Sequence, residues 1–160
     1  MQVKPMELVR EIRSGTAAPL MLAGGTEGFF LDEIEGALLD SVLKEDEKAF
    51  NLDIVYGSET NAVHLIAIAK SYPMMAEKRL ILVREAQNLH AREWEKLIPY
   101  LNAPSGSTVL AFMHRNKDPD KRKPQRKPLW VQSKRVLLKP NPCRKRDWWI
   151  LSSPKRGSIS

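Results

Sequence analysis

The sequence has almost no cysteine: Cys143 is the single one among 160 residues. One thiol cannot form an intrachain disulfide or a cysteine cluster for a metal ion, so we expect neither. No apolar run approaches the roughly 18 residues that a membrane helix needs. The N-terminal segment also lacks the apolar middle of a signal peptide. These absences predict a cytoplasmic protein that has no membrane span and no bound metal.

Charge is distributed unevenly along the chain. The formal net charge is +7, but residues 1–113 hold 11 Lys or Arg against 16 Asp or Glu, whereas residues 114–160 hold 15 against 3. Six of the 11 prolines also follow residue 118. Because the two regions differ so much in composition, we interpret them separately. We predict an α/β domain over residues 1–140 and a basic, irregular C-terminal tail over residues 141–160.

The acidic region alternates between helical and extended patterns. Apolar residues at helical spacing predict helices at 6–13, 29–43 and 90–101, and a fourth that is capped by Thr60 or Asn61 and runs through Ile68. Short apolar runs predict strands at 19–23, 50–56, 79–84 and 107–113, with 136–140 as a candidate last strand.

Strands that alternate with helical segments of about 10–15 residues form βαβ units, whose strands are parallel. We therefore predict a three-layer α/β domain with a mostly parallel sheet and helices on both faces. In the strand at 50–56, apolar and polar residues alternate. We expect one side of that strand to carry Phe50, Leu52, Ile54 and Tyr56.

The segment LMLAGGTEGFF, residues 20–30, has the strand–turn–helix pattern of a phosphate-binding loop. When the pattern GxxxxGK[ST] is placed on Gly24, its second glycine, lysine and hydroxyl positions fall on Phe29, Phe30 and Leu31. This loop therefore offers no lysine to a triphosphate and no hydroxyl to magnesium. The dinucleotide pattern GxGxxG does not fit either. We predict a degenerate nucleotide site with no bound cofactor and no catalytic residue, although an ordinary turn between a strand and a helix also favours glycine. The predicted degenerate loop comprises Gly24, Gly25 and Gly28.

The segment SYPMMAEKR, residues 71–79, is unusual for a connection. Pro73 cannot continue the preceding helix, so the helix must end near Tyr72. Met74 and Met75 then fall in a surface connection, and two adjacent side chains there cannot both turn inward. Methionine is flexible and adapts to the groove of a partner. The alternative is that both methionines fill the core under the edge of the sheet.

Five segments carry a family resemblance through their order and spacing. They are LAGGTEGFFLDEIEGAL, FNLDIVYGSE, SYPMMAEKRLILVREAQNL, STVLAFMHRNKDPDKRK and, near the end, RDWWI. Together they resemble the N-terminal, AAA+-like domain of the delta subunit of the bacterial DNA polymerase III clamp loader, over about residues 18 to 123. RDWWI resembles a tryptophan segment that follows the last strand of that domain. From this resemblance we expect the family's helical lid and collar domains to be absent from this sequence.

The resemblance implies a role in DNA replication as a protein that is not an enzyme by itself. In the family, an apolar pair enters a pocket on the sliding clamp, the beta subunit, and helps to open the ring for loading on DNA. ATP is hydrolysed by neighbouring clamp-loader subunits, and primed DNA is an indirect partner. The location implied is the replisome at the bacterial nucleoid. By position, the clamp-binding residues here would be Tyr72, Pro73, Met74 and Met75, where the family often has a Leu–Phe pair instead of Met–Met.

The basic region supports a second hypothesis, in which the chain binds nucleic acid and its α/β domain is a scaffold. Lysine and arginine would neutralise phosphates, and the tryptophans Trp130, Trp148 and Trp149 would stack on bases. Alternatively, the tail packs on the domain with its charges in water, or it is a truncated and partly disordered C-terminus. An ATPase of the P-loop class is the third hypothesis. The candidate DNA-binding residues are Lys121, Arg122, Lys123, Arg126 and Lys127.

Overall fold

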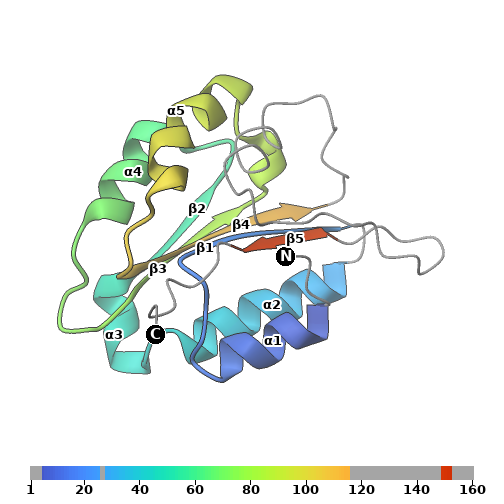
Figure 1. Cartoon of the computed structure of the whole chain (residues 1–160), viewed down its shortest axis with the longest axis vertical. Helices are drawn as coiled ribbons and strands as arrows, with labels where there is room; N and C mark the ends of the chain where they lie inside the picture. Colours follow the sequence, from blue (N-terminus) through green and yellow to red (C-terminus); the bar gives the residue numbers. More distant parts are fainter. Residues whose placement is uncertain (1–4, 26–27, 116–148, 153–160) are drawn as a thin grey trace, which may run out of the picture.

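The computed structural model describes residues 5–25, 28–115 and 149–152. Helices and strands alternate along most of this part of the chain, as Figure 1 shows. The elements are α1 (Pro5–Arg13), β1 (Leu20–Gly25), α2 (Gly28–Ser41), α3 (Glu45–Asn51), β2 (Leu52–Tyr56), α4 (Ala62–Lys70), β3 (Arg79–Arg84), the 3-10 turn η1 (Ala86–Asn88), α5 (Ala91–Asn102), β4 (Thr108–Arg115) and β5 (Trp149–Ser152).

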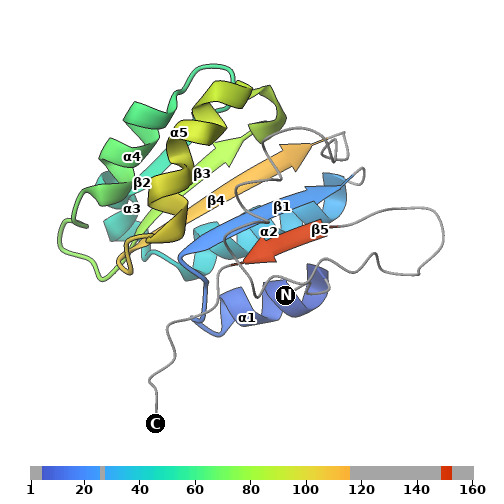
Figure 2. The same ribbon diagram turned by 45° about the horizontal axis from the view of Figure 1, so that its top comes forward.

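The five strands form one sheet in the order β2-β3-β4-β1-β5. Strands β2, β3, β4 and β1 are parallel, and β5 is antiparallel to β1. After β1 the chain crosses to the far edge of the sheet at β2 and returns through β3 to β4. With right-handed crossovers, this reversal places the connecting helices on opposite faces. Figures 1 and 2 show α1 and α2 on one face and α4 and α5 on the other. The predicted three-layer α/β fold is therefore confirmed.

Each face of the sheet has its own hydrophobic core. In β3, Leu80 and Leu82 join the core under α1 and α2, whereas Ile81 and Val83 join the core under α4 and α5. All four side chains are fully buried, and each contributes roughly 1.5–3 kcal/mol through removal from water. A strand that is covered on both faces explains why residues 79–84 form a nearly continuous apolar run.

The start of β2 differs from the prediction. The structure begins this strand at Leu52, after the short helix α3, so the predicted strand at residues 50–51 was wrong. Phe50, Ile54 and Tyr56 are all exposed, while Val55 packs against the core under α4 and α5. Apolar and polar residues do alternate here, but β2 is an edge strand. Three of the four residues predicted to share one side, namely Phe50, Ile54 and Tyr56, therefore face solvent.

The C-terminal segment also differs from the prediction. Trp149–Ser152 forms β5 and pairs with β1, so the expectation of an irregular tail was wrong for these residues. The last two residues of the RDWWI segment, Trp149 and Ile150, therefore lie in a strand of the sheet. The candidate strand at 136–140 lies outside the described residues, and the domain boundary after residue 140 stays a prediction. Within the part of the chain that the structure describes, no helix is long and apolar enough to cross a membrane.

Candidate functional site

The two segments of interest lie at opposite ends of the parallel strands. The predicted degenerate loop lies at the carboxyl end of β1, beside the carboxyl ends of β3 and β4, and includes the last two residues of β1. The segment with the two methionines connects α4 to the amino end of β3. We call residues 71–78 the tip loop.

Apolar side chains of the tip loop are directed outward. Tyr72 is 87% exposed, Met74 58% and Met75 97%, while Pro73 is half-buried. The alternative that both methionines fill the core is therefore wrong. Met75 has a φ of 53°, in the left-handed region that residues with a Cβ seldom adopt. Because the Met75 side chain is exposed, few packing contacts within the domain offset the cost of this backbone conformation. Strained conformations of this kind cluster at functional sites.

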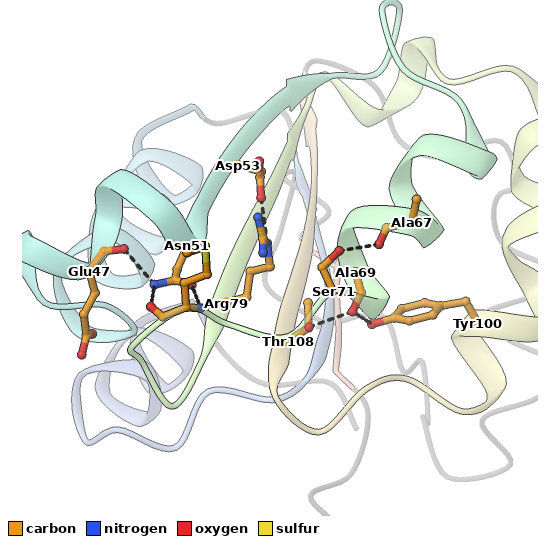
Figure 3. Close-up of polar contacts among 10 residues, drawn as sticks. Glu47, Asn51, Asp53, Ala67, Ala69, Ser71, Arg79, Tyr100 and Thr108 are labelled. Carbon is orange, nitrogen blue, oxygen red and sulfur yellow. Dashed lines mark hydrogen bonds and ion pairs between the residues drawn. The ribbon is translucent and has the colours of Figure 1, made fainter.

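Asn51 at the end of α3 holds the centre of the tip loop. Its side chain is fully buried, and it makes two hydrogen bonds to the backbone of Met74. The Met74 N–H donates to Asn51 Oδ1 at 2.6 Å, and Asn51 Nδ2 donates to the Met74 carbonyl at 2.8 Å. Asn51 Nδ2 also donates to the carbonyl of Glu47 at 3.0 Å, as Figure 3 shows. Both polar backbone groups of Met74 are therefore satisfied by one side chain from another element.

The entrance to the tip loop is fixed at the end of α4. Thr108 Oγ1 donates to the carbonyl of Ala69 at 2.8 Å, and the Tyr100 hydroxyl donates to the same oxygen at 3.4 Å (Figure 3). Burial raises the pKa of Tyr100, so this phenol remains a donor at neutral pH. Ser71 Oγ donates to the carbonyl of Ala67 at 2.9 Å. These bonds satisfy carbonyls that the helix end leaves without an intrahelical partner.

The exit from the tip loop is fixed to the neighbouring strands. Arg79 pairs with Asp53 of β2 through its Nε at 2.9 Å (Figure 3), and its backbone N–H donates to the carbonyl of Ser107 at 2.8 Å. Lys78 Nζ donates to the carbonyl of Gly106 at 2.6 Å. The loop is thus tied at its entrance, its centre and its exit, while its largest apolar side chains extend into solvent. A preordered loop loses less conformational entropy when it binds a partner.

The carboxyl end of the sheet has the opposite character. Gly24 and Gly25 end β1, and α2 begins at Gly28, next to Phe29 and Phe30, whose rings meet edge to face with centroids 5.3 Å apart. Gly25 lies beside Arg115, the last residue of β4. The predicted loop glycines are therefore at the point where open α/β sheets commonly bind ligands.

Two arginines at this end of the sheet pair with carboxylates of α2. Arg84, the last residue of β3, binds the nearly buried carboxylate of Glu35 through two nitrogens. The hydrogen bond with Glu35 raises the pKa of the Arg84 guanidinium, and a second hydrogen bond to the Tyr56 hydroxyl adds to the effect. Arg115 pairs with Asp32 in the first turns of α2. Both cations and both carboxylates are neutralised within the chain.

These pairs limit the chemistry at the carboxyl end. A triphosphate would compete with Glu35 and Asp32 for the two arginines, and a magnesium ion would compete with the arginines for the carboxylates. Among the described residues, no group of three or more His, Cys, Asp or Glu side chains is arranged to hold a metal ion.

Sequence reasoning missed Asn51 and the two ion pairs. A polar residue inside the apolar pattern FNLDIVY was the available signal for Asn51, but its partner is 23 residues away. Arg84 was predicted to end its strand, whereas the predicted strand at 107–113 stopped before Arg115, and in neither case did the local sequence identify the partner. The candidate DNA-binding residues Lys121, Arg122, Lys123, Arg126 and Lys127 lie outside the described residues.

Several solved structures resemble this fold. The DNA clamp loader delta protein of Bacillus subtilis has a TM-score of 0.69 at 23% identity, over 81% of this chain and 40% of that one. A DNA polymerase III gamma subunit-related protein from Thermotoga maritima has a TM-score of 0.52 at 14% identity, over 71% and 40% of the two chains. These likenesses confirm the three-layer α/β fold that the sequence predicted.

Sequence comparisons identify the family. The curated DNA polymerase III subunit delta of B. subtilis is 25% identical over 128 residues, which are 75% of this chain and 37% of that protein. The chain therefore spans well under half the length of that relative. The family profile described as "DNA polymerase III, delta subunit" matches residues 22–137, more than half of the chain. This chain belongs to the DNA polymerase III delta subunit family.

Proposed function

We propose that this chain acts in DNA replication by binding the sliding clamp through the tip loop and helping to open the ring for loading on DNA. Met74 and Met75 would enter an apolar pocket of the clamp, with Tyr72 and Pro73 shaping the approach. The observation that supports this proposal is the exposure of both methionines on a backbone fixed by buried hydrogen bonds.

The energy available from the two methionines is sufficient for specific binding. Transfer of each exposed methionine into an apolar pocket contributes roughly 1.5–3 kcal/mol. Since 1.4 kcal/mol changes affinity about tenfold, the pair accounts for a factor of about 10² to 10⁴ in the dissociation constant. In many interfaces, a few clustered side chains that lose their contact with water on binding provide most of the binding energy.

The test is a binding titration of this chain against the purified sliding clamp. The double variant Met74→Ala/Met75→Ala should lose at least about 100-fold in affinity. A matched control, Met6→Ala/Val63→Ala, removes two exposed apolar side chains from α1 and α4 and should bind as the unmodified chain does. Equal affinities of the double variant and the control would contradict the proposal.

We further propose that this chain does not hydrolyse ATP. The support is the apolar Phe29, Phe30 and Leu31 at the chemical positions of the phosphate-loop pattern, together with the ion pairs at the carboxyl end of the sheet. Equilibrium dialysis with ATP and Mg²⁺ should show no saturable binding at micromolar concentration. Stoichiometric binding in that range would favour an ATPase instead.

A second candidate function is nucleic-acid binding by the basic region. Its support is the excess of 12 positive charges over residues 114–160. If this function holds, a single-stranded oligonucleotide should bind with an affinity that falls steeply as salt increases. Substitution of Lys121, Arg122 and Lys123 by alanine should reduce both the affinity and the dependence on salt. These substitutions should leave clamp binding unchanged, because they do not alter the tip loop.

A further inference from the structure

We infer that Asn51 is a positioning residue that sets the conformation of the tip loop for partner binding, an inference that rests on the proposed clamp-binding function. Asn51 itself is fully buried and would not touch a partner. Its carboxamide accepts from the N–H of Met74 and donates to the C=O of Met74, so it bonds the peptide groups on both sides of that residue. A side chain at the end of α3 thus satisfies backbone groups of the tip loop that would otherwise need water or another backbone segment.

The chemistry of the contact selects asparagine. The site needs an acceptor for the Met74 N–H and a donor for the Met74 carbonyl, and an amide side chain supplies both. Aspartate would keep the acceptor but lose the donor and bury a charge, while alanine would lose both. Glutamine carries the same amide one methylene farther from the backbone, so it cannot fit the same space without displacing the loop.

The contact also explains how the strained residue persists. Met75 directly follows Met74 and has a φ of 53°. Residues with a Cβ avoid this region unless the surrounding structure determines their conformation. Because both backbone groups of Met74 are bonded to Asn51, the chain entering Met75 has a fixed direction. Release of Met74 would allow Met75 to return to a negative φ, which would redirect its side chain.

The role in positioning, rather than in stability alone, follows from what the contact holds. Met75 is almost fully exposed, so its orientation contributes little to packing within the domain. Glu47, whose carbonyl also accepts from Asn51, lies on the same short helix as Asn51 and orients the carboxamide. The bonds to Met74 span 23 residues of sequence and reach a segment whose largest side chains contact solvent.

The first test needs no variant. Hydrogen exchange of the unmodified chain should show a Met74 amide that is protected despite its place in an exposed loop, because it is bonded to a fully buried acceptor. The amide of Tyr72, in the same loop, is the internal comparison. Exchange of the Met74 amide as fast as that of an unstructured peptide would overturn the inference.

The second test is a double-variant cycle measured by clamp affinity. Asn51→Ala should weaken binding at least tenfold in the unmodified background but by less than threefold in a Met75→Ala background, because its effect passes through Met75. Leu38→Ala, in the core under α2, serves as a control that lowers Tm without touching the loop. If Asn51→Ala does not fold, Asn51→Ser, which keeps one hydroxyl, takes its place in the cycle.

The outcomes separate the two proposals. Unchanged affinity of Met74→Ala/Met75→Ala would contradict clamp binding by the tip loop itself. A loss in that double variant, together with an Asn51→Ala affinity equal to that of Leu38→Ala, would overturn only the positioning role. Full additivity of Asn51→Ala and Met75→Ala would also overturn it.

Discussion

The two ends of the sheet use polar groups in opposite ways. At the carboxyl end, where this fold commonly binds a ligand, charged side chains of β3 and β4 form ion pairs with charged side chains of α2. At the amino end, buried polar side chains bind the backbone of the tip loop, and apolar side chains are left in solvent. Polar contacts at the carboxyl end neutralise charges, whereas polar contacts at the amino end hold the tip loop so that its apolar side chains face solvent.

This difference separates stability from binding. Removal of a side chain at the carboxyl end leaves a partner without its bond, so the folded state becomes less stable. Removal of an exposed methionine at the amino end breaks few contacts within the chain, so the cost falls on binding. The substitutions below test this separation, from the largest expected effect to the smallest.

The largest effect is expected for Met75→Glu. The substitution replaces an apolar contact by a charge that would have to be desolvated on binding, so clamp affinity should fall by at least about 100-fold. Stability should change by less than about 0.5 kcal/mol, because the side chain is almost fully exposed. Val63→Glu, at an exposed position of α4, is the charge-matched control for the affinity titration and the urea unfolding. A large loss of stability with unchanged affinity would show that Met75 contributes to folding rather than to binding.

Arg84→Ala should act at the carboxyl end in the opposite sense. It leaves Glu35 nearly buried and without its cation, and because Arg84 is itself about one-third exposed we expect a loss of about 1–3 kcal/mol rather than the full cost of a buried charge. Urea unfolding measures the change, and clamp affinity at a temperature well below Tm should be unaltered. Arg92→Ala, at an exposed position of α5, is the control. Equal stability of the two variants would show that the Glu35 pair contributes nothing.

Met75→Gly distinguishes strain from side-chain contacts. Glycine adopts positive φ without the roughly 1–2 kcal/mol cost for residues with a Cβ, although its greater freedom in the unfolded chain offsets about 0.5–1 kcal/mol of that. Stability in urea should therefore stay equal or rise by up to about 1 kcal/mol, while clamp binding is lost with the side chain. Met74→Gly, at a residue without positive φ, should not show this gain. A clear destabilisation by Met75→Gly would argue against the strained backbone.

The smallest effect is expected for Glu93→Gln, at the start of α5. The hydrogen bond from Lys96, and then that from the Ala62 N–H, lower the pKa of Glu93 below 4.5. A carboxylate with a lowered pKa stabilises the folded state above pH 4.5, and this contribution is lost as pH falls through the folded-state value. Unmodified chain should thus have a slightly higher Tm than Glu93→Gln at pH 7, and the difference should shrink below pH 4.5. A difference that is the same at pH 7 and pH 3 would exclude the ionic contribution.

The sequence predicted the elements whose signal is local. The strands at 79–84 and 107–113 are long apolar runs with clear boundaries. Of the two candidate caps, Thr60 and Asn61, the structure selects Asn61, whose side chain accepts from the His64 N–H at 3.0 Å. The seven-residue helix α3 was missed because a short polar helix carries no apolar stripe. Strand β2 was placed too early because Phe50 extended its alternation by two residues.

The site was predictable only in part, for a similar reason. Pro73 and the adjacent methionines marked the tip loop within the sequence itself. The groups that hold this loop, such as Asn51 and Thr108, come from elements distant in the chain. Their local sequence does not indicate which residues they bond to. The pairing of Arg84 with Glu35, 49 residues apart, was hidden in the same way.

The outermost position of Met75 has a chemical consequence. An exposed sulfur is readily oxidised, so hydrogen peroxide would transfer one oxygen atom to Met75, giving methionine sulfoxide and water. The new sulfinyl dipole must be stripped of water before it enters an apolar pocket, which disfavours binding, whereas a Leu–Phe pair has no comparable reaction. Because the sulfoxide is reduced enzymatically, a methionine at this position would make the proposed binding to the clamp reversibly sensitive to oxidants.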